Sequence, residues 1–244
     1  MEKLKKEKVF INVVCNLVIV CLIAVFSLVY FSEKNIKNVS ASSNSEYNGT
    51  IYAGDKNSKN ISLMINVYWG TEYLEQMLEI FEKYQIKTTF FVGGSWAKDN
   101  IEILKRMHSV GHEIANHGTK HKEHGKLSYQ DNLTEIKTCH DVVKHILGIN
   151  MELFAPPGGS YNKHTTNAAE FLEYKTIMWT KDTIDWRDKN TNLIFNRATT
   201  NMSGGDLVLM HPTASTVEAL PKIIDCAMGK GFNLVPVSQT LALV

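Results

Sequence analysis

The chain has almost no net charge, which excludes one class of partner. Its 26 Lys and Arg against 25 Asp and Glu leave a formal net charge of +1 over 244 residues. So small a charge produces no long-range field that would recruit a polyanion. We therefore expect no nucleic-acid partner.

Cysteine is also scarce, and no internal repeat divides the chain. Cys15 and Cys21 lie in an apolar N-terminal run, so only Cys139 and Cys226 remain for the rest of the protein. An exported chain could oxidise this pair. Because both lie in helical patterns, where cysteine is usually a small buried hydrophobe, we expect free thiols. With 44% hydrophobic residues, the chain can bury one sizeable core.

Charged residues are absent from Val9 to Phe31. About 20 apolar residues, at a rise of ~1.5 Å each, span a ~30 Å hydrocarbon layer. Four lysines precede this run and two follow it closely, which places the short N-terminus in the cytoplasm and the remainder outside. We expect residues 1–31 to form a cytoplasmic stub and one N-terminal transmembrane helix. A cleaved signal peptide is the alternative, because Val39-Ser40-Ala41 could serve as its cleavage site.

Large apolar residues are rare in residues 32–60, where Ser, Asn and Lys dominate. Such a segment buries too little surface to order itself, so we expect a flexible linker. From Ile61 to Val244 short apolar strand patterns alternate with helical ones. Repeated strand–helix units predict one α/β domain with a parallel sheet, and seven or so of them favour a barrel with its chemistry at the carboxyl ends of the strands.

Several polar motifs directly follow predicted strands. His117 and His121 come after the strand at 114–116, and two imidazoles at this spacing can bind one divalent first-row metal. A hydrolytic site needs a third ligand and an open position as well. Three further motifs come later in the chain: Phe154-Ala155-Pro156-Pro157-Gly158-Gly159, Asp182-Thr183-Ile184-Asp185-Trp186 and Leu209-Met210-His211.

In this order the motifs resemble those of the NodB-type polysaccharide deacetylases, carbohydrate esterase family 4, over Ile61 to Val244. The resemblance implies a distorted (β/α) barrel and metal-dependent hydrolysis of N-acetyl groups on a cell-wall or chitin-like glycan. It implies that His117 and His121 hold a divalent metal, zinc first. It also implies that His211 is the general acid toward the leaving amine and that Leu209 lines the acetyl pocket.

The first motif of that family departs from the pattern here. Where the family carries two aspartates, a base and a metal ligand, this chain reads Met64-Ile65-Asn66-Val67-Tyr68-Trp69-Gly70. We take Asn66 and Tyr68 as the equivalent positions and expect them, with Trp69, to contact substrate. Asn66 can orient a water but cannot take its proton, and a tyrosine ionises only near pKa ~10.

Three carboxylates could substitute for the missing base, namely Glu72, Asp182 and Asp185. The arginine that usually precedes the Pro-Pro pair in the family is Ala155 here. Its loss is coherent with that of the base, because an arginine without its carboxylate would be an unpaired buried charge.

Substrate contacts are expected from two more motifs. Pro156, Pro157 and Gly158 would form a groove wall. Trp186 could stack on a pyranose ring; the alternative places Trp186 in the core and makes Asp185 a helix cap.

Two functions remain open. The first is a polysaccharide deacetylase, a hydrolase of non-peptide carbon–nitrogen bonds, with reduced activity. The second is a non-catalytic glycan-binding or scaffold protein on the same fold. In either case we expect an N-acetylated glycan such as peptidoglycan as partner. The domain would lie outside the cytoplasm, held by the membrane helix or secreted if the N-terminus is cleaved.

Overall fold

The computed structural model describes residues 49–243. The predicted membrane anchor, and most of the predicted linker, lie outside these residues. Within residues 49–243 no helix combines the length and the apolar character needed to cross a membrane. Cys139 and Cys226 are both free, as expected.

All the strands of the described part of the chain belong to one curled, parallel sheet. The strand order is β1-β6-β5-β4-β3-β2-β8-β7, and β9 pairs with the start of β2. Among residues 49–243 no ladder joins β1 to β7, so the barrel is left open there. This confirms the α/β class and the distorted barrel. The strands are β1 (Thr50–Ile51), β2 (Asn60–Val67), β3 (Thr89–Val92), β4 (Glu113–Asn116), β5 (Leu153–Phe154), β6 (Lys175–Ile177), β7 (Lys181–Asp182), β8 (Leu207–Met210) and β9 (Asn233–Leu234).

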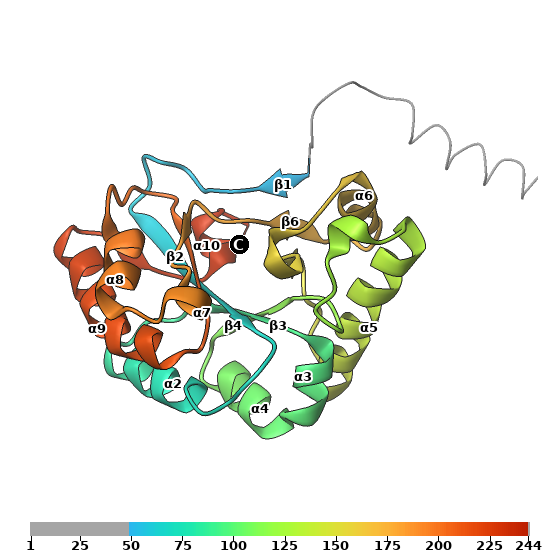
Figure 1. The fold of residues 1–244 in the computed structure, drawn as a ribbon, viewed down its shortest axis with the longest axis horizontal. Coiled ribbons are helices and arrows are strands. Elements are labelled where there is room, and N and C mark those ends of the chain that lie inside the picture. Colours follow the sequence, from blue (N-terminus) through green and yellow to red (C-terminus); the bar gives the residue numbers. More distant parts are fainter. Residues whose placement is uncertain (1–48, 244) are drawn as a thin grey trace, which may run out of the picture. The chain divides into compact units, whose positions relative to one another are not determined.

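Helices cover the outside of the sheet (Figure 1). The apolar spacing explains α2, which buries Leu74, Met77, Leu78 and Phe81 on one face. The longest of the described helices, α5, ends at Gly148 in the left-handed conformation expected of a C-cap. The helices are α2 (Leu74–Lys83), α3 (Gly94–Asp99), α4 (Ile101–Ser109), α5 (Tyr129–Leu147), α6 (Lys163–Phe171), α7 (Asp185–Asp188), α8 (Thr191–Thr199), α9 (Ala214–Gly229) and α10 (Val237–Thr240), with 3-10 turns η1 (His124–Lys126) and η2 (Pro157–Gly159).

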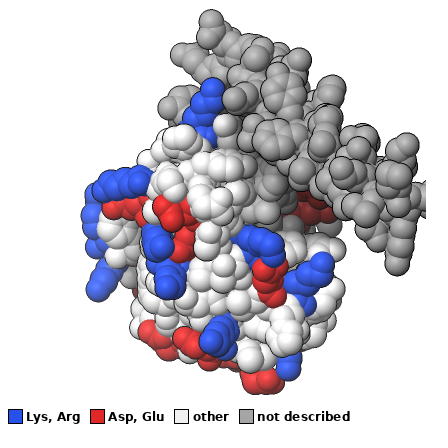
Figure 2. Space-filling model, turned by 90° about the vertical axis from the view of Figure 1, so that its right-hand side faces the viewer, with Lys and Arg blue, Asp and Glu red and all other residues white. Residues whose placement is uncertain are grey.

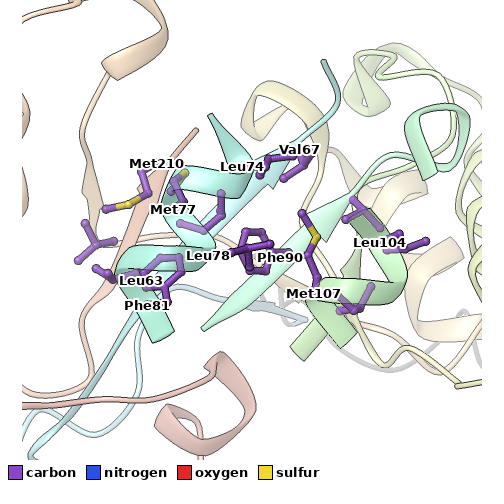
Figure 3. Packing of buried hydrophobic residues seen from close by; sticks show 14 of the residues in the cluster. Leu63, Val67, Leu74, Met77, Leu78, Phe81, Phe90, Leu104, Met107 and Met210 are labelled. Carbon is purple, nitrogen blue, oxygen red and sulfur yellow. The ribbon is translucent and has the colours of Figure 1, made fainter. Parts of the chain in front are cut away.

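Strand β2 separates two cores, because its side chains alternate between the faces of the sheet. Leu63, Ile65 and Val67 pack outward against the helices (Figure 3). Met64 points inward and joins a smaller cluster inside the barrel with Val237 of α10. The short helix α10 also bonds the starts of the strands, through Thr240 to Ser62 and through the Val237 amide to Thr89. Helix α10 therefore covers the amino ends of β2 and β3, whereas the amino ends of β4 and β5 border a cavity lined by Glu113 and Leu153. The polar motifs lie at the opposite, carboxyl ends of the strands.

The folded domain begins earlier than the predicted start at Ile61. Thr50–Ile51 forms β1 and pairs with β6, and the Gly54 amide donates to Gly205 O at 2.8 Å. The predicted linker boundary is corrected accordingly for residues 49–60. A two-residue edge strand has no periodicity to reveal it, because backbone bonds to a distant strand hold it in place.

Candidate functional site

Aromatic and imidazole rings from three strand ends meet at the carboxyl end of the barrel. His117 and His121 follow β4, and their ring centroids lie 5.2 Å apart. Tyr68, after β2, lies 4.8 Å from His121. Trp69 stacks on His211, which follows β8, at 6.0 Å and 10°. Residues predicted from separate motifs thus form one cluster.

The two histidines after β4 are neutral, so their ring nitrogens can act as metal ligands. His117 is buried, and its Nδ1–H donates to Ala155 O at 2.7 Å, which leaves the lone pair of Nε2 free. Burial, and next the neighbouring His121, hold the pKa of His117 well below its usual value. Burial and His211 also lower the pKa of His121. Neutral imidazoles are the form that binds metal.

His211 is held by Asp185, which is fully buried. The Nδ1–H of His211 donates to Asp185 Oδ1 at 2.7 Å, and its backbone N–H donates to Oδ2 at 2.6 Å. Thr216 Oγ1 and the Trp186 amide also donate to this carboxylate. Burial alone would raise the pKa of Asp185, but the bonds from His211 and Thr216 outweigh it and lower the pKa. The carboxylate is fully engaged, so Asp185 positions His211 and is not free to be the predicted surrogate base.

The other two predicted bases, Glu72 and Asp182, accept hydrogen bonds from backbone amides of their own loops. Glu72 is exposed, and its Oε2 accepts the Thr71 amide at 3.0 Å. Asp182 is half-buried, and its Oδ1 accepts the Ile184 amide at 2.9 Å. In the described part of the chain no group of three or more His, Cys, Asp or Glu side chains is arranged to hold a metal ion. Within residues 49–243 no carboxylate therefore completes the histidine pair.

The first motif supplies uncharged groups to the site. Asn66 is 4% exposed, and its buried Oδ1 has no hydrogen-bond partner among the described residues. Val67 is buried beside Leu74 in the outer core (Figure 3), so it faces away. Tyr68 turns back toward the site, where its ring lies on Gly93 and leaves no room for a side chain there. Positions 66 and 68 are thus the two that flank the site.

The donor set fits a divalent metal only in part. His117 and His121 supply two nitrogens, whereas catalytic zinc sites generally use three protein ligands. Asn66 offers a neutral amide oxygen, which lacks the charge of the aspartate expected there. These residues can hold a cation with water, but they do not complete a hydrolytic centre.

The proposed groove combines a buried wall with exposed indoles. Ala155, Pro156 and Pro157 are buried, and Gly158 adopts φ +60 in η2. Leu209 is buried inside the barrel. Trp69 and Trp186 are 47% and 53% exposed, so Trp186 lies on the surface and not in the core. Both indoles have faces available for a sugar ring.

Glu135 is a site residue that the sequence did not predict. Glu135 of α5 is 5% exposed, and its Oε2 accepts the Thr119 and Lys120 amides, which immediately precede His121. The sequence signal was its position on the buried face of α5, beside Ile136 and one turn from Cys139. A carboxylate there requires polar partners.

Sequence comparison gives the class of protein. Residues 53–177 match the model of the family described as polysaccharide deacetylase. The chain is 30% identical over 201 residues to a peptidoglycan-N-acetylglucosamine deacetylase of Bacillus cereus, covering 76% of this chain and 89% of that enzyme. This chain therefore belongs to the polysaccharide deacetylase family.

The chain is also similar to an uncharacterized protein and to solved structures of a pseudoenzyme. It is 35% identical over 191 residues to the uncharacterized protein YlxY of Bacillus subtilis, covering 78% of this chain but only 60% of that protein. Among solved structures it is similar to a carbohydrate esterase family 4 pseudoenzyme from Bacillus anthracis, with a TM-score of 0.77 and 34% identity over 79% of this chain and 68% of that one. A mutant of that pseudoenzyme is described as having restored enzymatic activity. Its structure matches with a TM-score of 0.77 and 33% identity, over 79% of this chain and 71% of the mutant chain.

Proposed function

We propose that this protein recognises an N-acetylated glycan, cell-wall peptidoglycan first, and hydrolyses its N-acetyl amide far more slowly than complete members of the family. One observation carries the proposal. The histidine pair and the His211–Asp185 unit are in place, whereas Asn66 stands where a carboxylate is expected and, among the described residues, no other carboxylate replaces it. The site thus has groups that can bind the substrate and donate a proton, but the described residues include none placed to remove a proton from water.

Each retained group has a definite task in this proposal. His211, held by Asp185, can give a proton to the departing amine from Nε2. His117 and His121 would hold the divalent cation, zinc first, which polarises the acetyl carbonyl when bound. Asn66 Oδ1 can orient a water but cannot remove its proton at neutral pH.

Glycan binding without hydrolysis is the second candidate. The specific observation in its favour is that Tyr68 and Trp69 lie against His121 and His211, where uncharged aromatic surface takes the place of acids. Aromatic faces bind sugar rings without a catalytic group. The similarity to a pseudoenzyme supports this candidate as well.

Acetate release from N-acetylated peptidoglycan, measured with glycan binding and metal content, tests the proposal. We expect measurable binding, weak acetate release, and loss of any stoichiometric zinc in the His117→Ala/His121→Ala double variant. Replacing the exposed His145 and His164 by Ala is the matched control. Unchanged metal content in the site variant would refute the metal assignment. Binding with no acetate release from any N-acetylated glycan would select the second candidate.

The location of the protein is part of the proposal. Because peptidoglycan lies outside the cytoplasmic membrane, a protein that acts on it must be exported. The lysines before Val9 and the apolar run that follows support an anchored, extracytoplasmic domain.

A further inference from the structure

The loop that carries the histidine pair rests on a buried carboxylate. Glu135 of α5 has a side chain that is 6% exposed. Its Oε2 accepts the amides of Thr119 at 3.1 Å and Lys120 at 2.8 Å. Its Oε1 lies 3.0 Å from Lys122 Nζ. The contacts therefore fall on both sides of His121 in the sequence.

Glu135 differs from the other charged side chains of its helix. Lys137 and Asp141 form an exposed pair at 2.5 Å. On the side of the molecule shown in Figure 2, charged side chains of both signs are interspersed over the surface. Surface pairs of this kind contribute little to stability. A buried carboxylate with two backbone donors and a lysine is a different case, because it must be fully bonded to be tolerated.

His121 has an unusual backbone conformation. Its φ of +51 lies in the left-handed region, which a residue other than glycine rarely adopts. Such a conformation is disfavoured and persists only where its surroundings enforce it. The Glu135 contacts on Thr119, Lys120 and Lys122 are such surroundings.

Independent contacts hold the two ends of this loop. At the start, Asn116 Oδ1 accepts the Gly118 amide, and Asn116 Nδ2 donates to Ile136 O. At the end, His124 Nδ1 bonds Asn132 Oδ1 at 2.7 Å. Thr119 keeps the bond from its Oγ1 to the backbone O of Glu135 at 2.7 Å, and its own O accepts the Ser95 amide at 3.0 Å. Loss of the Glu135 carboxylate would therefore release the loop around Lys120 and His121 and leave both ends in place.

We propose that Glu135 is a positioning residue, which fixes the His121 ring against Tyr68 and beside His117. The backbone bonds to Thr119 and Lys120 carry this effect. Lys122 adds less, because its side chain is 48% exposed and the ion pair is screened. The importance of the ring position rests on the proposed function, but the ring position itself does not.

Nuclear magnetic resonance of the isotope-labelled full chain tests this without an activity assay. The readouts are the cross-relaxation between the Tyr68 and His121 rings, 4.8 Å apart by centroid, and the hydrogen exchange of the Thr119 and Lys120 amides. In Glu135→Leu we expect the ring contact to be lost. We also expect those two amides to exchange at least ~10-fold faster, since a lost bond of ~1.4 kcal/mol gives that factor.

Three further variants separate positioning from general stability. Glu135→Gln keeps an acceptor oxygen for both amides and should restore the ring contact. Glu135→Asp keeps the charge but shortens the side chain, so it should lose the contact even if Glu135→Leu fails to fold. Lys122→Ala should leave the contact intact. The proposal is overturned if Tyr68 and His121 stay in contact in Glu135→Asp, or if amides across β4 and α5 lose protection as much as those of Thr119 and Lys120. Failure to release acetate would refute the proposed hydrolysis and leave these readouts unaffected.

Discussion

Asn66→Asp is the substitution that best tests the site, because it places a charge where the structure offers no partner for one. Asn66 is 4% exposed, and its Oδ1 has no hydrogen-bond partner within residues 49–243. Ala155, which is fully buried, stands where the family usually has an arginine. His117, which follows β4, is neutral, since its pKa is well below the usual value. A carboxylate at position 66 would thus be buried and unpaired.

The magnitude follows from these surroundings. An uncompensated buried charge costs about 3–5 kcal/mol. For a folded unit of about 200 residues, 1 kcal/mol shifts Tm by about 2–4 °C, so Tm should fall by about 6–20 °C. Zinc should reverse part of the loss, because the carboxylate introduced by Asn66→Asp would complete a three-ligand site with His117 and His121. At about 100 times Kd a ligand stabilises the folded state by about 2.7 kcal/mol.

Thermal unfolding with and without zinc measures both effects. Asn192→Asp on the exposed surface of α8 is the matched control and should change Tm little in either condition. The same Tm in Asn66→Asp and the unsubstituted protein, with and without zinc, would refute the reasoning about burial and ligation.

Activity adds a second, independent readout. Asn66→Asp alone should raise acetate release little, because one carboxylate cannot be both metal ligand and base. Acids at both 66 and 68 should raise the rate by about 10²–10⁴. Strong activity of the unsubstituted protein that survives Glu72→Gln, Asp182→Asn and Asp185→Asn separately would show that another group is the base.

Further predictions concern pH, the His211 partner and topology. Burial, with Lys87 nearby, lowers the pKa of His112 to about 4. In the unfolded chain the same imidazole takes up a proton near pH ~6.5. The free energy of unfolding should therefore fall by at most about 3 kcal/mol as the pH drops from ~6.5 to ~4. His112→Phe should flatten the dependence of Tm on pH, and parallel curves would contradict this. Asp185→Asn should lower the free energy of unfolding by about 2–4 kcal/mol and Asp182→Asn by under about 1 kcal/mol, because only the first breaks a buried network. Equal Tm values for the two variants would contradict this. Protease added to intact, wall-stripped cells should digest the domain, and full protection with accessible controls would mean that the predicted orientation is wrong.

The sequence by itself determined most of the local structure and the set of candidate site residues. Apolar spacing accounts for α2, and a glycine accounts for the C-cap at position 148, because these features depend on neighbours a few residues away. The histidines after β4 and the missing aspartates of the first motif were also visible, since motif order along the chain carries them. The residues that replace the two aspartates and the arginine already led us to expect weak hydrolysis.

The tertiary structure decided which of these residues act together. Asp185 and His211 lie 26 positions apart and meet only because β7 pairs with β8. The proposed role of Glu135 depends on the packing of α5 against the loop that follows β4. Asn66 Oδ1 lacks a partner because none of the described strands places a donor near it. Local patterns record which face of an element is buried. They do not record which element lies opposite, because that is fixed by strand order and packing across the whole sheet.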